Sequence, residues 1–159
     1  MKKYIVILII ALAFTSCSDF LNLKPENQIN ENGFYKTAGD FETAAFGMYS
    51  GLQTLHDMPM LSLGELTTDN MRTTDRLSNP PIVRIECNED ALTSTNSYVN
   101  TVWRSAYTTI AQSNNILSRI DNVDFDASKK KQFKGEALFL RAYCYFYLVR
   151  LFGDVPLVD

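Results

Sequence analysis

The segment from Phe133 to Pro156 limits the possible folds more than any other part of the chain, because it is apolar on almost every side of a helix. Its side chains follow alternating steps of four and three residues, the spacing of one α-helical face. That row is Phe133, Ala137, Leu140, Cys144, Tyr147 and Leu151, and a second apolar row is Phe139, Ala142, Tyr143, Phe146 and Val149. Such a helix loses favourable burial unless other helices surround it, so the sequence predicts a core helix between partners. Arg150, a left-handed cap at Gly153 and then Pro156 mark its end.

A second helical pattern opens at Thr37. The spacing from Thr37 to Asp40 is that of a capping box, with aspartate in the usual place of Glu or Gln. The predicted buried face is Phe41, Ala45, Met48, Leu52 and Leu55. Gly47 and Gly51 lie inside this helix, where each glycine costs about 1 kcal/mol against alanine, so we expect another helix to approach closely there.

A third helix is predicted from one face of mostly large side chains: Trp103, Tyr107, Ile110, Asn114 and Leu117. A buried asparagine needs partners for its amide, so we expect Asn114 to bond a neighbouring helix or a loop carbonyl. Core packing is the expected role of Trp103 and Tyr107, with a platform for stacking a sugar as the alternative. Asp126 is the predicted N-cap of the last helix.

Residues 56–97 show no sustained period, which indicates a functional loop or elements whose pattern is hard to read. Only Ile82 to Glu86 alternates like a strand, and this piece is too short to indicate a sheet protein. Most side chains able to hold a ligand lie in the same stretch: Glu65, Asp69, Asn70, Arg72, Asp75, Arg76, Asn79 and Arg84.

Composition and motifs argue against several function classes. The 15 basic and 18 acidic residues give a net charge of −3, whereas nucleic-acid binding needs a concentrated basic face, so no nucleic acid is expected as a partner. The one histidine, His56, is expected on the surface, and no nucleophile motif accompanies it, so no catalytic residue is predicted. The carboxylates of Glu65 and Asp69 leave glycosidase chemistry as a distant alternative.

The cysteines and the lone histidine do not form a pattern typical of a metal site, and no metal or other cofactor is expected. Cys87 and Cys144 allow a disulfide in an oxidising compartment. Cys144 lies in the most apolar helix, however, where the role of a small hydrophobic residue is favoured.

The first seventeen residues have the pattern of an exported protein. Lys2 and Lys3 precede an apolar run of eleven residues, Tyr4 to Phe14. That run is too short for a bilayer-spanning helix, which takes about 20 residues. The small residues ending in Cys17 resemble a bacterial lipobox, although Phe14 stands where leucine is usual. The sequence thus predicts lipidation of Cys17, with a plain signal peptide or an uncleaved anchor helix as alternatives.

Four motifs, in this order along the chain, resemble those of SusD/RagB-type outer-membrane lipoproteins. They are the lipobox cysteine followed by SDFL, GELTTDN at Gly64 to Asn70, the W-x3-Y-x2-I-x3-N face, and GEALFLRAYCYFYLVRLFGDVPLV. The last motif is the most specific, and the resemblance covers nearly the whole chain. It implies an all-α fold of tetratricopeptide-like helix pairs with long irregular loops. We therefore expect a signal peptide at 1–16, a lipidated tether at 17–35, and the N-terminal part of a SusD-like helical domain at 36–159.

The resemblance also implies a function. Such a protein is a non-catalytic lipoprotein, anchored in the outer membrane and exposed at the cell surface, that binds oligosaccharides or other nutrients. It delivers them to a SusC-like TonB-dependent transporter. A lipoprotein used only for protein docking is the alternative, and an exported glycoside hydrolase a distant one.

In proteins that this chain resembles, the loop after GELTTDN leads toward the ligand-facing side. Contacts are therefore expected from Asp69, Asn70, Arg72 and Arg76, whose polar groups suit vicinal hydroxyls or anionic sugars. Family members are several-fold longer, so we expect this chain to represent a truncated N-terminal part. Helical repeats with uncovered faces are marginally stable, and we expect the same of residues 18–159 alone.

Overall fold

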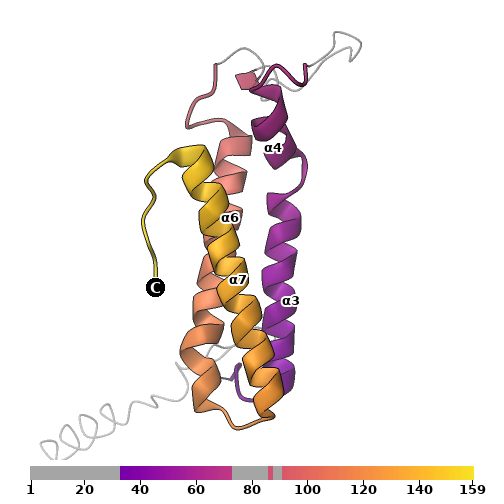
Figure 1. Ribbon diagram of the computed structural model, residues 1–159, viewed down its shortest axis with the longest axis vertical. Coiled ribbons are helices and arrows are strands. Elements are labelled where there is room, and N and C mark those ends of the chain that lie inside the picture. Colours follow the sequence, from indigo (N-terminus) through magenta and orange to yellow (C-terminus); the bar gives the residue numbers. More distant parts are fainter. Residues whose placement is uncertain (1–32, 73–85, 88–90) are drawn as a thin grey trace, which may run out of the picture. The chain divides into compact units, whose positions relative to one another are not determined.

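The computed structural model describes residues 33–72, 86–87 and 91–159. The chain falls into two units, residues 1–34 and 35–159, and the architecture below is that of the second. Its elements are α3 (Ala38–Leu55), α4 (Met58–Leu61), the π-helix η1 (Ser62–Leu66), α6 (Ser97–Arg119), the 3₁₀-helix η2 (Ile120–Asn122) and α7 (Ala127–Phe152). All of these elements of the described ranges are helical, which confirms the all-α prediction (Figure 1). None of the described helices is long and apolar enough to cross a bilayer.

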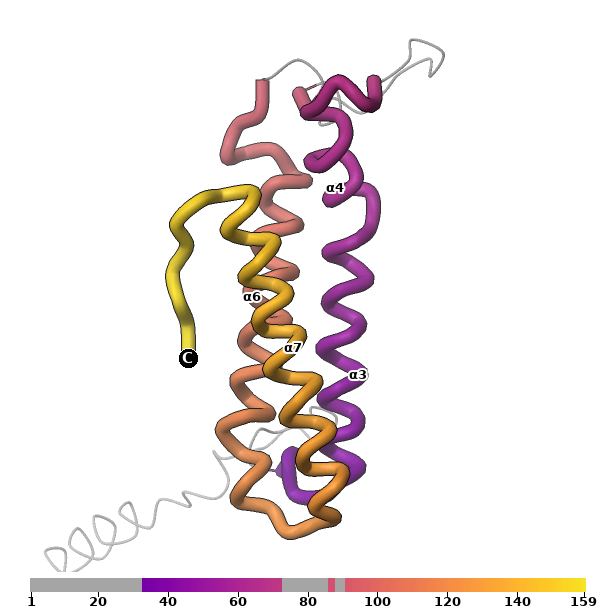
Figure 2. Tube along the Cα trace, in the orientation of Figure 1, coloured from indigo at the N-terminus to yellow at the C-terminus, as the bar shows by residue number. Residues whose placement is uncertain are grey.

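The three long helices α3, α6 and α7 pack side by side. α6 runs antiparallel to both of the others, and α3 and α7 run in the same direction (Figure 2). Only η2 and a short turn connect α6 to α7. A connection of this length makes consecutive helices antiparallel neighbours.

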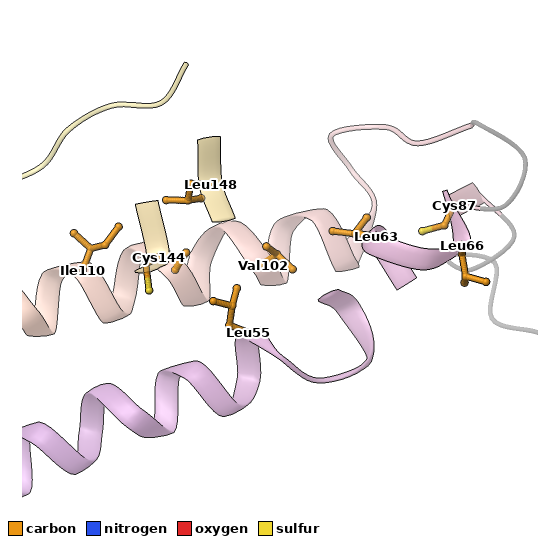
Figure 3. Close-up of a cluster of buried hydrophobic side chains, with 9 residues drawn as sticks. Leu55, Leu63, Leu66, Cys87, Val102, Ile110, Cys144 and Leu148 are labelled. Carbon is orange, nitrogen blue, oxygen red and sulfur yellow. The ribbon is translucent and has the colours of Figure 1, made fainter. Parts of the chain in front are cut away.

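The core consists of two clusters along the bundle. The first, shown in Figure 3, is Leu55, Leu63, Leu66, Cys87, Val102, Ala106, Ile110, Cys144 and Leu148. The second is Phe41, Ala45, Met48, Ile116, Ile120, Phe133, Ala137 and Leu140. The predicted row of α7 is therefore buried as far as Cys144, after which Leu148 takes the buried place and Tyr147 and Leu151 are only partly buried. The row drifts because 3.6 residues per turn do not match a strict seven-residue repeat.

The second apolar row of α7 faces solvent. Phe139 is 64% exposed and Phe146 is 53% exposed. Within the described residues the main packing partners of α7 are α6 and α3. The predicted helix between partners therefore holds for its buried row, and the other row is one of the uncovered faces that the sequence also predicted. An open apolar face remains along α7, and it also includes Leu138 and Val149.

The buried face of α6 is turned by one position, about 100°, from the predicted one. It consists of Val102, Ala106, Thr109, Ile110, Ser113 and Ile116. Of the predicted row only Ile110 is fully buried, and the prediction is wrong for the larger side chains of Trp103, Tyr107 and Leu117, which are partly buried and pack against the core from its edge. The buried hydroxyls of Thr109 and Ser113 donate to carbonyls of their own helix, at 3.0 and 2.8 Å, and so need no partner elsewhere.

The ends of the long helices follow local capping rules. Thr37 and Asp40 form the predicted capping box, each side chain accepting from the other residue's N–H. Asp126 accepts from the N–H of Lys129 at 2.9 Å, which confirms it as the N-cap of α7. Gly153 caps α7 with the predicted positive φ, +72°, although its ψ of −131° is far from the left-handed helical value.

The stretch without a sustained period contains helical residues 58–66, so here the second of its two readings, elements whose pattern is hard to read, is confirmed. Asp57 accepts from the N–H of Met58 at 2.8 Å, and Pro59 follows in the first turn. There its missing N–H would have had no helical partner, so proline starts a helix instead of breaking one. The strand-like residues 82–85 lie outside the described residues.

Cys87 and Cys144 are both buried, and they do not form the disulfide that the sequence allowed. Burial raises the pKa of the Cys144 thiol to about 11. A neutral, buried thiol behaves as a small hydrophobic residue, as predicted.

Residues 153–159, which we call the C-terminal strap, turn back and run alongside the bundle (Figure 1). Side chains of two helices hold its main chain. Tyr107 Oη donates to the carbonyl of Pro156 at 2.8 Å, and Tyr145 Oη accepts from the N–H of Val158 at 2.8 Å. The strap is therefore fixed by hydrogen bonds to its backbone, which depend little on its own side chains.

Asn114 has the partners that the sequence predicted. Its amide donates to the strap carbonyl of Val158 at 2.8 Å, and its Oδ1 accepts from Arg141 on α7 at 2.9 Å. Trp103 packs edge-on against Phe152, with ring centres 5.0 Å apart. The predicted face of α6 thus seats the strap and the end of α7 instead of forming the main core.

The predicted close approach of α3 to α6 occurs at Gly51 and not at Gly47. A Cβ at Gly51 would lie 2.2 Å from Thr109 Oγ1, whereas at Gly47 the nearest atom would be 3.8 Å away. We expect Gly51→Ala to lower the free energy of unfolding by about 1–3 kcal/mol, the usual cost of overpacking. Urea unfolding of the full chain, followed by circular dichroism, measures this.

Gly135→Ala in α7 is the matched control, because a Cβ there meets nothing within 4 Å. It should raise the free energy of unfolding by about 1 kcal/mol through helix propensity. Equal gains in stability from both substitutions would contradict the close approach at Gly51.

Tyr145→Phe removes the acceptor of the Val158 N–H and so tests the strap. The variant also loses the 3.3 Å bond that Tyr145 Oη donates to the Val158 carbonyl, and we expect amide exchange at Val158 to be at least about threefold faster. Hydrogen exchange followed by NMR measures it, with Tyr49→Phe, at a tyrosine that is 45% exposed on α3, as the control. Exchange at Val158 that is equal in both variants would show that the strap is held in another way.

Candidate functional site

One end of the bundle carries a head formed by α4, η1 and the turn after it, residues 67–72 (Figure 1). The GELTTDN motif lies in this head. Ser62, Leu63 and Leu66 are buried and fix η1 on the bundle. A π-helix is rare and often marks a functional site. The head therefore combines an unusual backbone with a concentration of polar side chains.

The turn after η1 encloses a hollow of about 350 Å³, which we call the turn hollow. Three of the four predicted ligand residues line it together: Asp69, Asn70 and Arg72. All three are exposed. The fourth, Arg76, and the predicted lipidation site, Cys17, lie outside the described residues.

Hydrogen bonds of the threonines shape this turn. Thr67 Oγ1 donates to the carbonyl of Leu63 at 2.7 Å, and Thr68 Oγ1 donates to that of Glu65 at 2.8 Å. Thr68 Oγ1 also accepts from the N–H of Asn70 at 3.3 Å. Because the threonines satisfy the backbone, the carboxylate, amide and guanidinium that line the hollow are free to meet a ligand. Together they can accept from and donate to neighbouring hydroxyls.

A second hollow, of about 490 Å³, lies between η1 and the end of α7, and we call it the η1–α7 hollow. Its polar lining comes from His56, Glu65, Tyr147 and Arg150. The sequence predicted a surface position for His56 and a core position for Tyr147, and it indicated a ligand role for neither. No local pattern joins them, because they meet only once α3 and α7 lie in parallel.

His56 is exposed but not isolated. Its Nε2 lies 2.7 Å from Tyr143 Oη, which in turn donates to Tyr147 Oη at 3.3 Å. Burial, followed by the hydrogen bond to Tyr147, raises the pKa of Tyr143 to about 12, so this phenol stays protonated at physiological pH. The three rings form a connected set, of which His56 and Tyr147 line the η1–α7 hollow.

The two carboxylates that left glycosidase chemistry open line different hollows. Glu65 belongs to the η1–α7 hollow and Asp69 to the turn hollow. Within the described ranges, no group of three or more His, Cys, Asp or Glu residues is placed to hold a metal ion. The head is thus a polar surface with two neighbouring hollows, and its chemistry suits hydrogen bonding.

Comparison with known proteins shows which sequences this chain is similar to. The sequence model of the SusD-like family, described as "Starch-binding associating with outer membrane", matches residues 19–159. SusD-like protein P2 of Formosa agariphila is 30% identical over 167 residues, which cover 100% of this chain and 32% of that protein. SusD-like protein P25 of the same organism is 30% identical over 98% of this chain and 31% of its own length.

A more distant relative is a SusD-like protein of Bacteroides ovatus, 24% identical over 99% of this chain and 29% of its own length. This chain thus spans about a third of the length of these relatives. No solved structure matches it significantly. The family model covers the whole helical unit and its head, and the chain therefore belongs to the SusD-like family.

Proposed function

We propose that this chain forms part of a non-catalytic, lipid-anchored protein of the cell surface that captures oligosaccharides or other nutrients. It delivers them to a SusC-like TonB-dependent transporter of the outer membrane. The observation that carries the proposal is the family match over residues 19–159, described as starch-binding and associated with the outer membrane. The hydrogen-bonding character of the head supports it.

The proposed anchor is a lipid on Cys17, placed after a signal peptide of residues 1–16. Residues 17–35 act as a tether, and residues 36–159 belong to the helical domain. The sequence from Lys2 to Cys17 supports this division, since a basic start, a short apolar run and a lipobox-like cysteine occur in that order. Several acyl chains on one terminus hold a protein firmly, because each buried methylene adds about 0.8 kcal/mol.

The proposed ligand contacts are Asp69, Asn70, Arg72 and Arg76. The first three are supported by their shared position around the turn hollow. A hydroxyl group both donates and accepts, so a sugar with neighbouring hydroxyls can use the carboxylate, the amide and the guanidinium at once.

Protein docking is the second candidate function, and one observation favours it. α7 exposes apolar side chains in a row, with Phe139 at 64% and Phe146 at 53% exposure. Exposed apolar side chains gathered on one face mark interaction sites in many proteins. A hydrolase is less well supported, because Glu65 and Asp69 line separate hollows and so do not flank one bond.

Cys17→Ala tests the anchor. When the full chain is produced in a bacterial host fed radiolabelled palmitate, we expect label in the wild-type chain and in the membrane fraction. The variant should lose the label, because the thiol that accepts the lipid is gone. Equal labelling of the two chains would refute the anchor at this position.

Binding of polysaccharides tests the capture of nutrients. The full chain, kept in detergent, is run through native gels containing soluble starch or one of a panel of neutral and anionic polysaccharides. We expect at least one of these polysaccharides to slow the migration of the wild-type chain. The Asn70→Ala/Arg72→Gln double variant should bind that polysaccharide about tenfold more weakly or worse, since each charge-assisted hydrogen bond contributes about 1.5–3 kcal/mol. Arg104→Gln, at an exposed arginine of α6 that lines neither hollow of the head, is the control.

Other outcomes of this assay decide between the candidates. Release of shortened sugars would indicate a hydrolase. Retention by none of the polysaccharides, together with specific capture of a transporter protein, would favour the docking function.

A further inference from the structure

We propose that the η1–α7 hollow is a second sugar-binding subsite, in which Glu65, Tyr147 and Arg150 bond the hydroxyls of one uncharged sugar unit. The inference rests on the proposed capture of oligosaccharides and adds a site to the turn hollow. Its chemical class of ligand is a neutral polyol ring, and not an anionic sugar or a peptide.

Opposite charges line this hollow without pairing. Glu65 and Arg150 both line it, yet the only ion pair within the described ranges joins Lys134 to Asp121. Their charged groups therefore lie more than 4.0 Å apart and leave room between them. A neutral ligand that offers hydroxyls to both suits this arrangement, because each hydroxyl donates to the carboxylate or accepts from the guanidinium.

The exposed side chain of Arg150 lies against two aromatic rings before any ligand arrives. Its guanidinium carbon lies 5.2 Å from the ring centre of Phe146 and 5.9 Å from that of Tyr147. Contact with these rings limits the rotamers of the side chain. A preorganised donor of this kind costs little entropy on binding.

The phenol of Tyr147 is oriented by a chain of two hydrogen bonds. Tyr143 has a single hydroxyl proton and donates it to Tyr147 Oη, so His56 Nε2 acts as the donor to Tyr143. The proton of Tyr147 is not used in this chain. Tyr147 lines the hollow, and its O–H is therefore available as a donor to a ligand hydroxyl.

The remaining lining of the hollow is apolar. Met60, Leu61, Leu63 and Leu151 form it. A sugar ring has both C–H faces and hydroxyl edges, and a hollow with an apolar wall and a few polar groups matches both. The volume, about 490 Å³, lies in the range of small-molecule sites, about 300–1,000 Å³.

The test uses maltoheptaose and the full chain in detergent, with three separate substitutions: Glu65→Gln, Tyr147→Phe and Arg150→Gln. Glu65→Gln removes a charge and Tyr147→Phe removes one hydroxyl while the shape of each side chain is kept, and Arg150→Gln removes the guanidinium. Circular dichroism checks that the helices persist. We expect each variant to bind maltoheptaose at least fivefold more weakly by isothermal titration calorimetry. Arg104→Gln should bind like the wild-type chain.

His56 gives an independent readout, because it is the one histidine of the chain. Its imidazole NMR signals report on this hollow without interference, and we expect them to shift on addition of maltoheptaose. A dipeptide and glucuronate are the competing probes. If the dipeptide or glucuronate shifts the His56 signals and maltoheptaose does not, the assignment of this hollow to a neutral sugar is overturned.

Two failures are distinguishable. If the wild-type chain binds maltoheptaose, the turn-hollow double variant loses binding and the three variants do not, the second subsite is refuted while the proposed function stands. If the wild-type chain binds neither maltoheptaose nor any polysaccharide of the panel, the proposed function fails, and the second subsite fails with it.

Discussion

The close approach of α3 and α6 at Gly51 and Thr109 is the constraint on which the rest of the bundle depends. Two helices come this near only where one side presents glycine and the other presents small side chains, here Ala106, Thr109 and Ser113. With these residues turned toward α3, the larger side chains of α6 are directed to its flank. That flank seats the C-terminal strap and the end of α7, through Trp103 and the hydrogen bonds of Asn114.

α7 has three roles, two of which belong to its sides and one to its C-terminal end. One side completes both core clusters, from Phe133 to Leu148. Another carries Tyr145, which bonds the strap, and Arg141, which bonds Asn114 of α6. The end of the helix brings Tyr147 and Arg150 to the head, beside His56. The function we propose is therefore located where helix ends and a π-helix meet, while the regular part of the bundle serves as a rigid support.

Features that depend on near neighbours in the sequence could be predicted, and features that depend on helix spacing could not. The caps at Thr37 and Asp126 require only residues three positions away, and both are confirmed. The buried face of α6 was missed, because it depends on how closely α3 approaches. Asp69 and Arg72 share a hollow because one short turn contains them, whereas the η1–α7 hollow joins the end of α3 to the end of α7 and leaves no local pattern. Membership of the SusD-like family followed from ordered motifs, not from periodicity.

Hydrogen exchange of the full chain, compared with and without a retained polysaccharide, tests most directly whether the head is the ligand-binding end. A ligand that occupies the two hollows should slow exchange in residues 56–72 and 147–151. The strap and the outer side of α7 around Phe139 should exchange at unchanged rates. Protection confined to the outer side of α7, with none in the head, would contradict the account and would place the interaction surface on the open apolar face.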